Sequence, residues 1–392
     1  VYFVPLSLLL LTVVVGMMLR RPLVRLRWTH YFSWLLLLYI GWDLFFAQQQ
    51  IGQHRNSFLR GSPVLKGDWN TPKPDLYLIV WDEYTGNDGL QSFFGYANDS
   101  FTVQLSRRNF QLSGHARSNY SFTVFSMASL LNLGYLDFNE KLLPENTYAY
   151  QASLRLIREN AFMQYLRNFG YTLVNRSPFD LFEETAFHSQ EKLPQGLRLL
   201  FWPTLPAQIA EALPRYFAAQ VKWPYFFNQW VTESIAYNES LFRDTLPKIL
   251  ADNNQPDCYY AHFNMPHEPF VFSAGGQLLQ PLSGLTMEEY KRNYLSYLQY
   301  TNSRVLAYVD QLLRDTRGQA VILLVSDHGF RGGAEVGMRT GVPFSCLQAC
   351  YLPAGFQRRW NDSTTQVNLL RGLYNSMHTD SLPFLADTLF IP

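Results

Sequence analysis

Short, almost continuous apolar runs recur along this chain of 392 residues, and they constrain its fold more than any other feature. The first run, DLYLIVW at residues 75–81, follows a proline and does not alternate between polar and apolar positions. A run of this kind is typical of a strand buried on both faces of a parallel sheet. Similar runs occupy residues 171–174, 258–263, 320–325 and 347–352. We therefore expect buried strands at all five places.

Helical patterns lie between these runs. The clearest follows Thr286, where Glu289 completes a capping box. Apolar and aromatic residues then recur at spacings of three and four up to Leu312, which forms one amphipathic face. Strands that alternate with helices predict an α/β domain with a mostly parallel sheet. In such sheets, ligands bind just beyond the carboxyl ends of the strands.

Two longer apolar runs precede this region, at residues 1–19 and 31–47. A membrane-spanning helix needs about 20 apolar residues, and about 17 can suffice. A signal peptide fits less well, because a second run follows closely and the positive charge comes after the first run. The sequence predicts two transmembrane helices, and because residue 1 is Val we expect a longer membrane region before them. Two buried core helices are the alternative.

The loop between the two runs predicts the orientation of the chain. It carries four arginines and no acid, and short basic loops remain on the cytoplasmic side. We therefore expect a multi-pass protein of the cell (inner) membrane. Its residues 1–47 are membrane helices, residues 48–73 are a linker with several Gly and Pro, and residues 74–392 form a domain outside the cytoplasm.

Composition excludes several classes of protein. Apolar residues make up 47% of the chain and charged residues 16%, which excludes an intrinsically disordered chain. A net charge of +1 argues against a nucleic-acid partner. Three cysteines without a Cys-x-x-Cys pair exclude a disulfide framework and a zinc ribbon. Cys346 and Cys350 are close enough in sequence to pair, although two buried thiols are the simpler interpretation.

Polar residues follow three of the predicted strands. Asp82 and Glu83 lie at the end of the first run, Asp327 and His328 follow the fourth, and His267 follows the third. The carboxyl ends of parallel strands meet at one edge of a sheet, so these side chains are expected to converge. Two carboxylates and a histidine suit a divalent cation. Oxygen ligands favour Mg, Ca or Mn, and the mixed set also suits Zn.

Thr123 begins a further helical stretch, TVFSMASLLN. A hydroxyl at a helix N-terminus gains from the helix dipole, which favours an attacking alkoxide and an anionic substrate. A Thr before a helix is more often a simple N-cap, and an Asp after a strand is often only a cap. The order of these residues along the chain, together with the predicted fold, favours a site.

Taken together, the motifs resemble the sulfatase-like branch of the alkaline phosphatase superfamily. That branch includes lipoteichoic acid synthase and the bacterial phosphoglycerol and phosphoethanolamine transferases. PDLYLIVWDEY is similar to the family's first strand with its metal-binding acid, and SDHGF to the late metal-binding motif. NMPHEPF is similar to the segment whose histidine faces the substrate, and TVFSMASLLN to the helix that begins with the nucleophile. The resemblance covers residues 74–392.

This resemblance implies a three-layer αβα sandwich with a mostly parallel central sheet. It implies that Thr123 is the nucleophile and that His267 faces the substrate. The metal ligands that it implies are Asp82, Thr123, Asp327 and His328.

Two departures from the family narrow the interpretation. Sulfatases need a Cys or Ser followed by Pro and Arg, whereas Phe125 and Met127 stand at those positions and Thr123 cannot become formylglycine. We therefore expect phosphoryl chemistry. The Asp-x₃-His pattern of two-metal members is also absent, because Asp257 and His262 have the wrong spacing. We expect one divalent ion, Mn, Mg, Ca or Zn, and we interpret His262 as a strand histidine satisfied by its neighbours.

Three further residues have alternative roles. Glu83 is either a second carboxylate ligand or a structural hydrogen-bonding residue. Arg117 and Arg331 are candidates for substrate binding, because a guanidinium pairs bidentately with phosphate. A solvated or structural role is at least as consistent for each arginine.

The sequence thus predicts a membrane-anchored, metal-dependent phosphotransferase or phosphodiesterase that acts through a covalent intermediate on Thr123. A membrane anchor favours a phospholipid headgroup as donor and a glycan or another cell-envelope polymer as acceptor. One alternative is a sulfatase-like hydrolase of phosphate or sulfuric esters. The other is a non-catalytic membrane scaffold with a degenerate enzyme domain.

Overall fold

The computed structural model describes residues 28, 30–38, 40–42, 58–66, 73–138, 142–144, 146–187, 224–244, 255–279, 285–332 and 341–391. Contacts between residues divide the chain into two compact units, Val1–Ser57 and Phe58–Pro392. All the candidate site residues named above lie in the second unit.

The first unit contains helical residues at 30–38 and 40–42, and their large apolar side chains, such as Trp34 and Leu38, are exposed. In the part of the chain that the structure describes, no helix combines the length and the apolar character needed to cross a membrane. The first apolar run and part of the second lie outside the described residues. The two transmembrane helices therefore stay a prediction.

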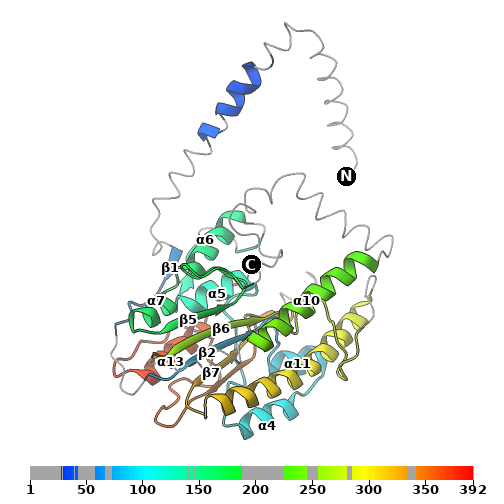
Figure 1. Ribbon diagram of the computed structural model, residues 1–392, viewed down its shortest axis with the longest axis vertical. Coiled ribbons are helices and arrows are strands. Elements are labelled where there is room, and N and C mark those ends of the chain that lie inside the picture. Colours follow the sequence, from blue (N-terminus) through cyan, green and yellow to red (C-terminus); the bar gives the residue numbers. More distant parts are fainter. Residues whose placement is uncertain are drawn as a thin grey trace. The chain divides into compact units, whose positions relative to one another are not determined.

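A six-stranded sheet forms the centre of the second unit, with the strand order β3-β8-β7-β2-β6-β5 (Figure 1). Strand β2 (Leu76–Trp81) pairs in parallel with β6 (Asp257–Phe263) on one side and with β7 (Val321–Val325) on the other. The remaining strands are β5 (Thr172–Arg176), parallel to β6, and the antiparallel β8 (Gln348–Tyr351) and β3 (Gln111–Leu112). The sheet is mostly parallel, and all five predicted runs form strands in it.

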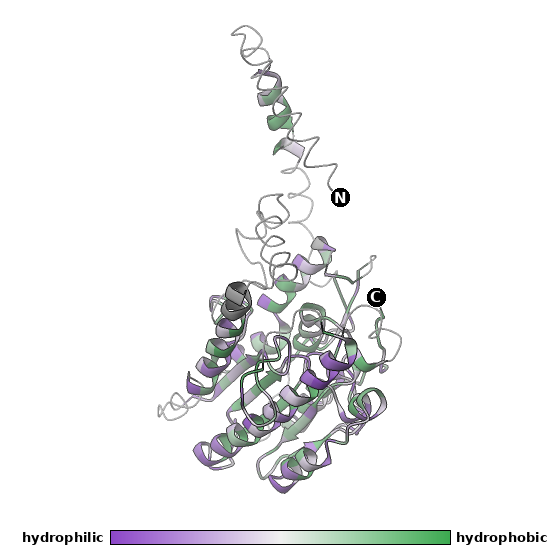
Figure 2. Ribbon diagram, turned by 90° about the vertical axis from the view of Figure 1, so that its right-hand side faces the viewer, coloured by the Kyte–Doolittle hydropathy of each residue, from purple (hydrophilic) through white to green (hydrophobic). Residues whose placement is uncertain are grey.

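Alternate residues of each strand fill two separate cores, because successive side chains of a strand point to opposite faces. On β2, Leu78 and Val80 belong to one core, whereas Ile79 and Trp81 belong to the other. Figure 2 shows the hydrophobic strands inside and hydrophilic residues along the outer sides of the helices. This pattern matches an α/β domain whose sheet is covered on both faces.

Helices cover each face of the sheet, which gives the unit its three layers (Figure 1). The first core packs against α5 (Thr123–Leu131), α6 (Thr147–Arg158), α7 (Ala161–Asn168) and α13 (Gln366–Met377). The second core packs against α3 (Asn87–Phe94), α4 (Asp99–Arg107), α10 (Pro224–Asp244) and α11 (Met287–Asp315). Helix α11 begins with the predicted capping box, in which the Thr286 hydroxyl accepts from the Glu289 N–H.

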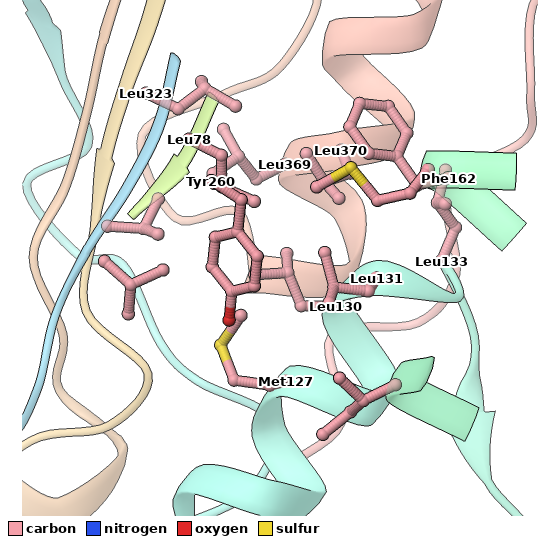
Figure 3. Packing of buried hydrophobic residues seen from close by; sticks show 14 of the residues in the cluster. Leu78, Met127, Leu130, Leu131, Leu133, Phe162, Tyr260, Leu323, Leu369 and Leu370 are labelled. Atoms are coloured by element: carbon pink, nitrogen blue, oxygen red, sulfur yellow. The ribbon is translucent and has the colours of Figure 1, made fainter. Parts of the chain in front are cut away.

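The first core holds α5 against the sheet. Figure 3 shows Leu78, Tyr260 and Leu323, from three adjacent strands, packed towards Met127 and Leu131 of α5. All five side chains are fully or almost fully buried. Because α5 begins at Thr123, this packing also sets where the predicted nucleophile lies relative to the strand ends.

A smaller sheet joins two distant segments. Strand β1 (Leu59–Arg60) pairs antiparallel with β4 (Tyr135–Leu136). Residues 58–66 therefore belong to the second compact unit, although they fall in the stretch that the sequence assigns to a linker. The short 3₁₀ turn η3 (Val342–Phe344) precedes β8, and the three cysteines are buried and free.

The layered packing generates a test of stability. Replacing Leu78 by Ala should lower the free energy of unfolding by about 2–5 kcal/mol, because the side chain is fully buried between β2 and α5. Leu278 is 60% exposed, so Leu278→Ala should change that free energy by less than about 0.5 kcal/mol. Denaturant unfolding of both variants checks this, and equal losses would contradict the assigned core.

Candidate functional site

Parallel pairing brings the predicted strand-end residues to one edge of the sheet. Val80 pairs with His262 of β6 and with Val325 of β7, so the three strands end at nearly the same level. Asp82 and Asp327 come within two residues of these pairs. The backbone N–H of Asp82 donates to the carbonyl of Phe263 at 2.9 Å, which continues the ladder past the end of β2.

Four predicted residues meet at this edge. Nε2 of His328 lies 3.3 Å from Oδ2 of Asp327, 3.7 Å from Oδ1 of Asp82 and 3.3 Å from Oγ1 of Thr123. Asp327 and His328 are fully buried, and Thr123 is half-buried at the first position of α5. The structure therefore brings Asp82, Thr123, Asp327 and His328 together as the motifs imply.

His262 joins this group, and the sequence interpretation had set it aside. One ligand atom each from Asp82, His262 and Asp327 lies within 4.8 Å of the others. Nε2 of His262 is 4.0 Å from Oδ2 of Asp82, whereas His328 faces Oδ1 of the same carboxylate. Strand alternation was the available signal, because residues 258 and 260 face α5 and residue 262 follows in the same row.

Burial keeps both histidines neutral. It lowers the pKa of His328 to about 3 and that of His262 to about 4. Nδ1 of His328 is 2.8 Å from the Gly329 carbonyl, so Nδ1 carries the proton and Nε2 presents its lone pair to the centre. Neutral imidazole with one nitrogen fixed by a carbonyl is the form in which histidine binds metals.

Asp327 supplies a buried carboxylate to the same centre. Burial acts to raise the pKa of Asp327, but His328, His262 and the Glu83 N–H hold this pKa below its usual value. Its Oδ1 accepts from the backbone N–H groups of Glu83 and His328 at 3.0 and 2.9 Å. Oδ2 of Asp327 and Nε2 of His262 are two of several buried side-chain atoms in the described part of the chain that have no hydrogen bond.

These donors fit a divalent cation. Asp82, His262 and Asp327 each offer a ligand atom to one small region, Nε2 of His328 lies 3.7 and 3.3 Å from the two carboxylates, and a cation would satisfy the buried Oδ2 and Nε2 atoms. Mixed oxygen and nitrogen ligands suit Zn or Mn and do not single out one metal. Asp82, His262, Asp327 and His328, with the Thr123 hydroxyl beside them, are the residues that would hold the ion.

A second group lies beside the centre and contains His267, Glu83 and Arg331. Nδ1 of His267 is 2.7 Å from the Glu268 carbonyl, which leaves Nε2 to accept from the Arg331 guanidinium at 3.1 Å. Oε2 of Glu83 is 3.7 Å from the same Nε2, and Oε1 accepts from the Arg331 N–H at 2.7 Å. The Arg331 guanidinium also lies over the ring of Phe122, 5.3 Å from its centroid.

The structure gives the candidates that the sequence left open different partners. Oε1 of Glu83 accepts from the Arg331 backbone N–H, and Oε2 lies 3.7 Å from Nε2 of His267. Burial raises the pKa of Glu83, while His267 and Arg331 act to lower it. Arg117 pairs with Asp88 at 3.0 Å, and no described contact joins it to the centre. Arg331, in contrast, lies in the site.

Comparison with known proteins gives distant structural relatives. No protein-family model and no curated protein matches the chain. The chain is similar to the C-terminal periplasmic domain of EptC from Escherichia coli, solved in complex with Zn. The identity is 10% and the TM-score 0.47, over 83% of this chain and 88% of that one.

Two further solved structures show a comparable likeness. One is the integral membrane lipooligosaccharide phosphoethanolamine transferase A (EptA) from Neisseria meningitidis. Its identity is 10% and its TM-score 0.46, over 96% of this chain and 70% of that one. The other is the putative sulfatase yidJ from Bacteroides fragilis, with 16% identity and a TM-score of 0.44, over 80% of this chain and 76% of that one.

The metal assignment predicts the behaviour of two histidine variants. His262→Ala should lower the affinity for a divalent ion by about 10- to 100-fold or more, because it removes a ligand atom. His115→Ala is the matched control, since His115 is largely exposed and pairs only with Asp88 in the described structure. Elemental analysis and metal titration provide the measurement. Unchanged affinity in His262→Ala would remove it from the site, and two ions per wild-type chain would refute the single-ion expectation.

The lowered histidine pKa values predict acid sensitivity of the metal-free protein. Between pH 6 and 5, an unfolded histidine binds a proton, whereas His262 and His328 do not in the folded state. The free energy of unfolding should therefore fall as pH falls, by about 1.4 kcal/mol per pH unit for each histidine. Urea unfolding in chelator measures this slope. His262→Asn removes one of the two histidines and should make the slope shallower by about 1.4 kcal/mol per pH unit, and an unchanged slope would contradict the buried neutral state.

Proposed function

We propose that this chain is a membrane-anchored, metal-dependent phosphotransferase or phosphodiesterase that forms a covalent intermediate on Thr123. One observation carries the proposal: the Thr123 hydroxyl lies 3.3 Å from Nε2 of His328, which itself lies 3.7 and 3.3 Å from the carboxylates of Asp82 and Asp327. A hydroxyl, a cation site and a positively charged guanidinium at one strand edge suit attack on an anionic phosphorus centre.

Two features of α5 support Thr123 as the nucleophile. It is the first residue of α5, and Phe122, which cannot cap a helix with its side chain, occupies the N-cap position. The Thr123 hydroxyl is therefore available for the acceptors of the centre, and the positive end of the helix dipole favours negative charge at that point. In the proposed step, the Thr123 hydroxyl releases its proton to solvent and Oγ1 forms a bond to phosphorus, while the bond from phosphorus to the donor's alcohol oxygen breaks.

The neighbouring residues would stabilise the charge that this step develops. A bound divalent ion would lower the pKa of a nearby hydroxyl and neutralise phosphoryl oxygens. The Arg331 guanidinium lies over the ring of Phe122 and 4.0 Å from Oε1 of Glu83, and a guanidinium in this position could pair with two oxygens of a phosphate. We assign the proton that the leaving oxygen takes up to His267, which would first take a proton from solvent at Nε2 in place of its contact with the Arg331 guanidinium. A second hydroxyl, from water or an acceptor, then removes the phosphoryl group from Thr123.

The core around α5 supports phosphoryl rather than sulfuryl chemistry. A sulfatase would need Pro and Arg at the positions of Phe125 and Met127, and both of these side chains are fully buried in the apolar core. An arginine at residue 127 would lose its hydration there without a partner. Thr123 also has no route to the aldehyde that sulfatases use.

The substrate class follows from the proposed anchoring. The apolar runs at residues 1–19 and 31–47, with arginines between them, support an anchor whose following domain lies outside the cytoplasm. We propose a phospholipid as donor of its phosphate-linked headgroup and a glycan or other cell-envelope polymer as acceptor. A plain hydrolase of phosphate or sulfuric esters would show the same centre but release free headgroup, and a scaffold would need neither metal nor Thr123.

The proposal is tested by removing the nucleophile. Thr123→Ala should reduce kcat by about 10⁴–10⁶-fold, because no other oxygen can carry the intermediate. Thr123→Ser should keep part of the activity, since a primary hydroxyl can attack from the same place. The measurement uses the full chain with vesicles of phosphatidylethanolamine or phosphatidylglycerol. Intact-mass analysis should show the headgroup added to wild type and absent from Thr123→Ala.

Thr102→Ala in α4 is the matched control, because its hydroxyl contacts only the Asp99 carbonyl in the described structure. It should retain full activity. A folded, metal-loaded Thr123→Ala protein that turns over phosphodiester at nearly the wild-type rate would overturn the covalent mechanism. Free headgroup as the sole product, in the presence of acceptor, would favour the hydrolase.

A further inference from the structure

A strap without helix or strand, residues 382–391, runs back along α13 to the segment that precedes α5. Polar side chains hold its backbone at short intervals. Asn375 accepts from the Leu382 N–H at 2.6 Å, and Asn368 accepts from the Leu385 N–H at 2.9 Å. Thr365 donates to Asp387 at 2.7 Å. The strap is therefore anchored along most of its length.

The far end of the strap meets the approach to the nucleophile. The side-chain amide of Asn119 donates to the Thr388 carbonyl at 2.9 Å, and the Asn119 carbonyl accepts from the Phe390 N–H at 2.9 Å. The Asn119 side-chain oxygen also accepts from the Val367 N–H at the start of α13, at 3.1 Å. One buried asparagine thus ties the strap and α13 to a point four residues before Thr123.

Phe390 also contacts Tyr120, the residue that follows Asn119, through its aromatic ring. Its ring stacks on Tyr120 with centroids 4.8 Å apart and planes 7° apart, and it lies 5.1 Å from the ring of Tyr135. The hydroxyl of buried Tyr120 accepts from the Leu136 N–H at 2.8 Å, so Tyr120 cannot turn away freely. The neighbours Leu389 and Ile391 are exposed, at 36% and 66%. Phe390 is thus the inward-facing side chain at this point.

We propose that the strap positions Thr123 for attack, with Phe390 as its positioning residue. Residues 119–122 lead directly to Thr123, and the N-cap residue Phe122 makes no side-chain hydrogen bond to the first turn of α5. The contacts of Asn119 and Phe390 add a constraint on this segment to the one that the packing of α5 supplies. A displacement of the hydroxyl by about 1 Å is enough to lower a rate by roughly 10²-fold.

The inference rests on the proposed function of Thr123, and it is tested on the full chain with the same vesicles. Phe390→Ala should lower kcat by about 10- to 100-fold while KM and metal content stay within about two-fold of wild type. Phe390→Tyr should restore most of the rate, because it keeps the stacked ring. Leu389→Ala and Ile391→Ala are the matched controls and should behave as wild type, since both side chains point to solvent.

Amide hydrogen exchange provides a readout that does not need activity. Exchange at residues 119–123 should be faster in Phe390→Ala than in Leu389→Ala, with the strands β2 and β7 unchanged. If Phe390→Ala does not fold, Phe390→Leu replaces it, because leucine keeps apolar burial and loses the stacking. A kcat equal to that of Leu389→Ala, or a parallel loss of metal and of exchange protection in β2, would overturn the positioning role.

The two proposals fail in different ways. If wild type forms no adduct and turns over no phosphodiester, the proposed function fails, and the strap is then judged by exchange alone. If wild type is active but Phe390→Ala is equally active, only the strap inference fails.

Discussion

The candidate site depends on the parallel pairing of β2 with both of its neighbours. Parallel strands end at the same edge, so residues far apart in the sequence, such as Asp82 and Asp327, are brought together by backbone hydrogen bonds alone. The same pairing buries them, because both faces of the sheet are covered by helices. Burial then keeps the histidines neutral, which is the form in which imidazole binds a metal ion.

Much of this could be predicted from the sequence, for a physical reason. A strand buried on both faces must be apolar throughout, so the runs that became β2, β6 and β7 were readable without any structure. Polar residues at the end of such a run are costly to bury. They therefore indicate the edge of the sheet at which a functional site is expected. Asp82, Asp327 and His328 were found in this way, and Thr123 by the helix that it begins.

The roles that could not be predicted depend on which neighbouring helix or strand each side chain faces. His262 lies inside a strand, and only the row that it shares with Tyr260 reveals that it faces α5 and the centre. Glu83 is adjacent to Asp82 in sequence, but its backbone has a positive φ of 62°. Its carboxylate accepts a hydrogen bond from the Arg331 backbone N–H. Arg117 and Arg331 are alike in sequence terms, and the nearby carboxylate of Asp88 separates them. The contacts between the strap and Asn119 join residues more than 200 positions apart, and no short sequence pattern predicts them.

The division of the strands into two rows has a consequence for how homologous sequences should vary. On β2, residues 76, 78 and 80 face the core that contains α5, whereas residues 77, 79 and 81 face the core that contains α11. Substitutions in the first row should therefore be compensated in α5 and α13, and those in the second row in α4 and α11. Neighbouring residues of one strand would then evolve with different partners, and the half of the domain that carries the nucleophile could diverge separately from the other.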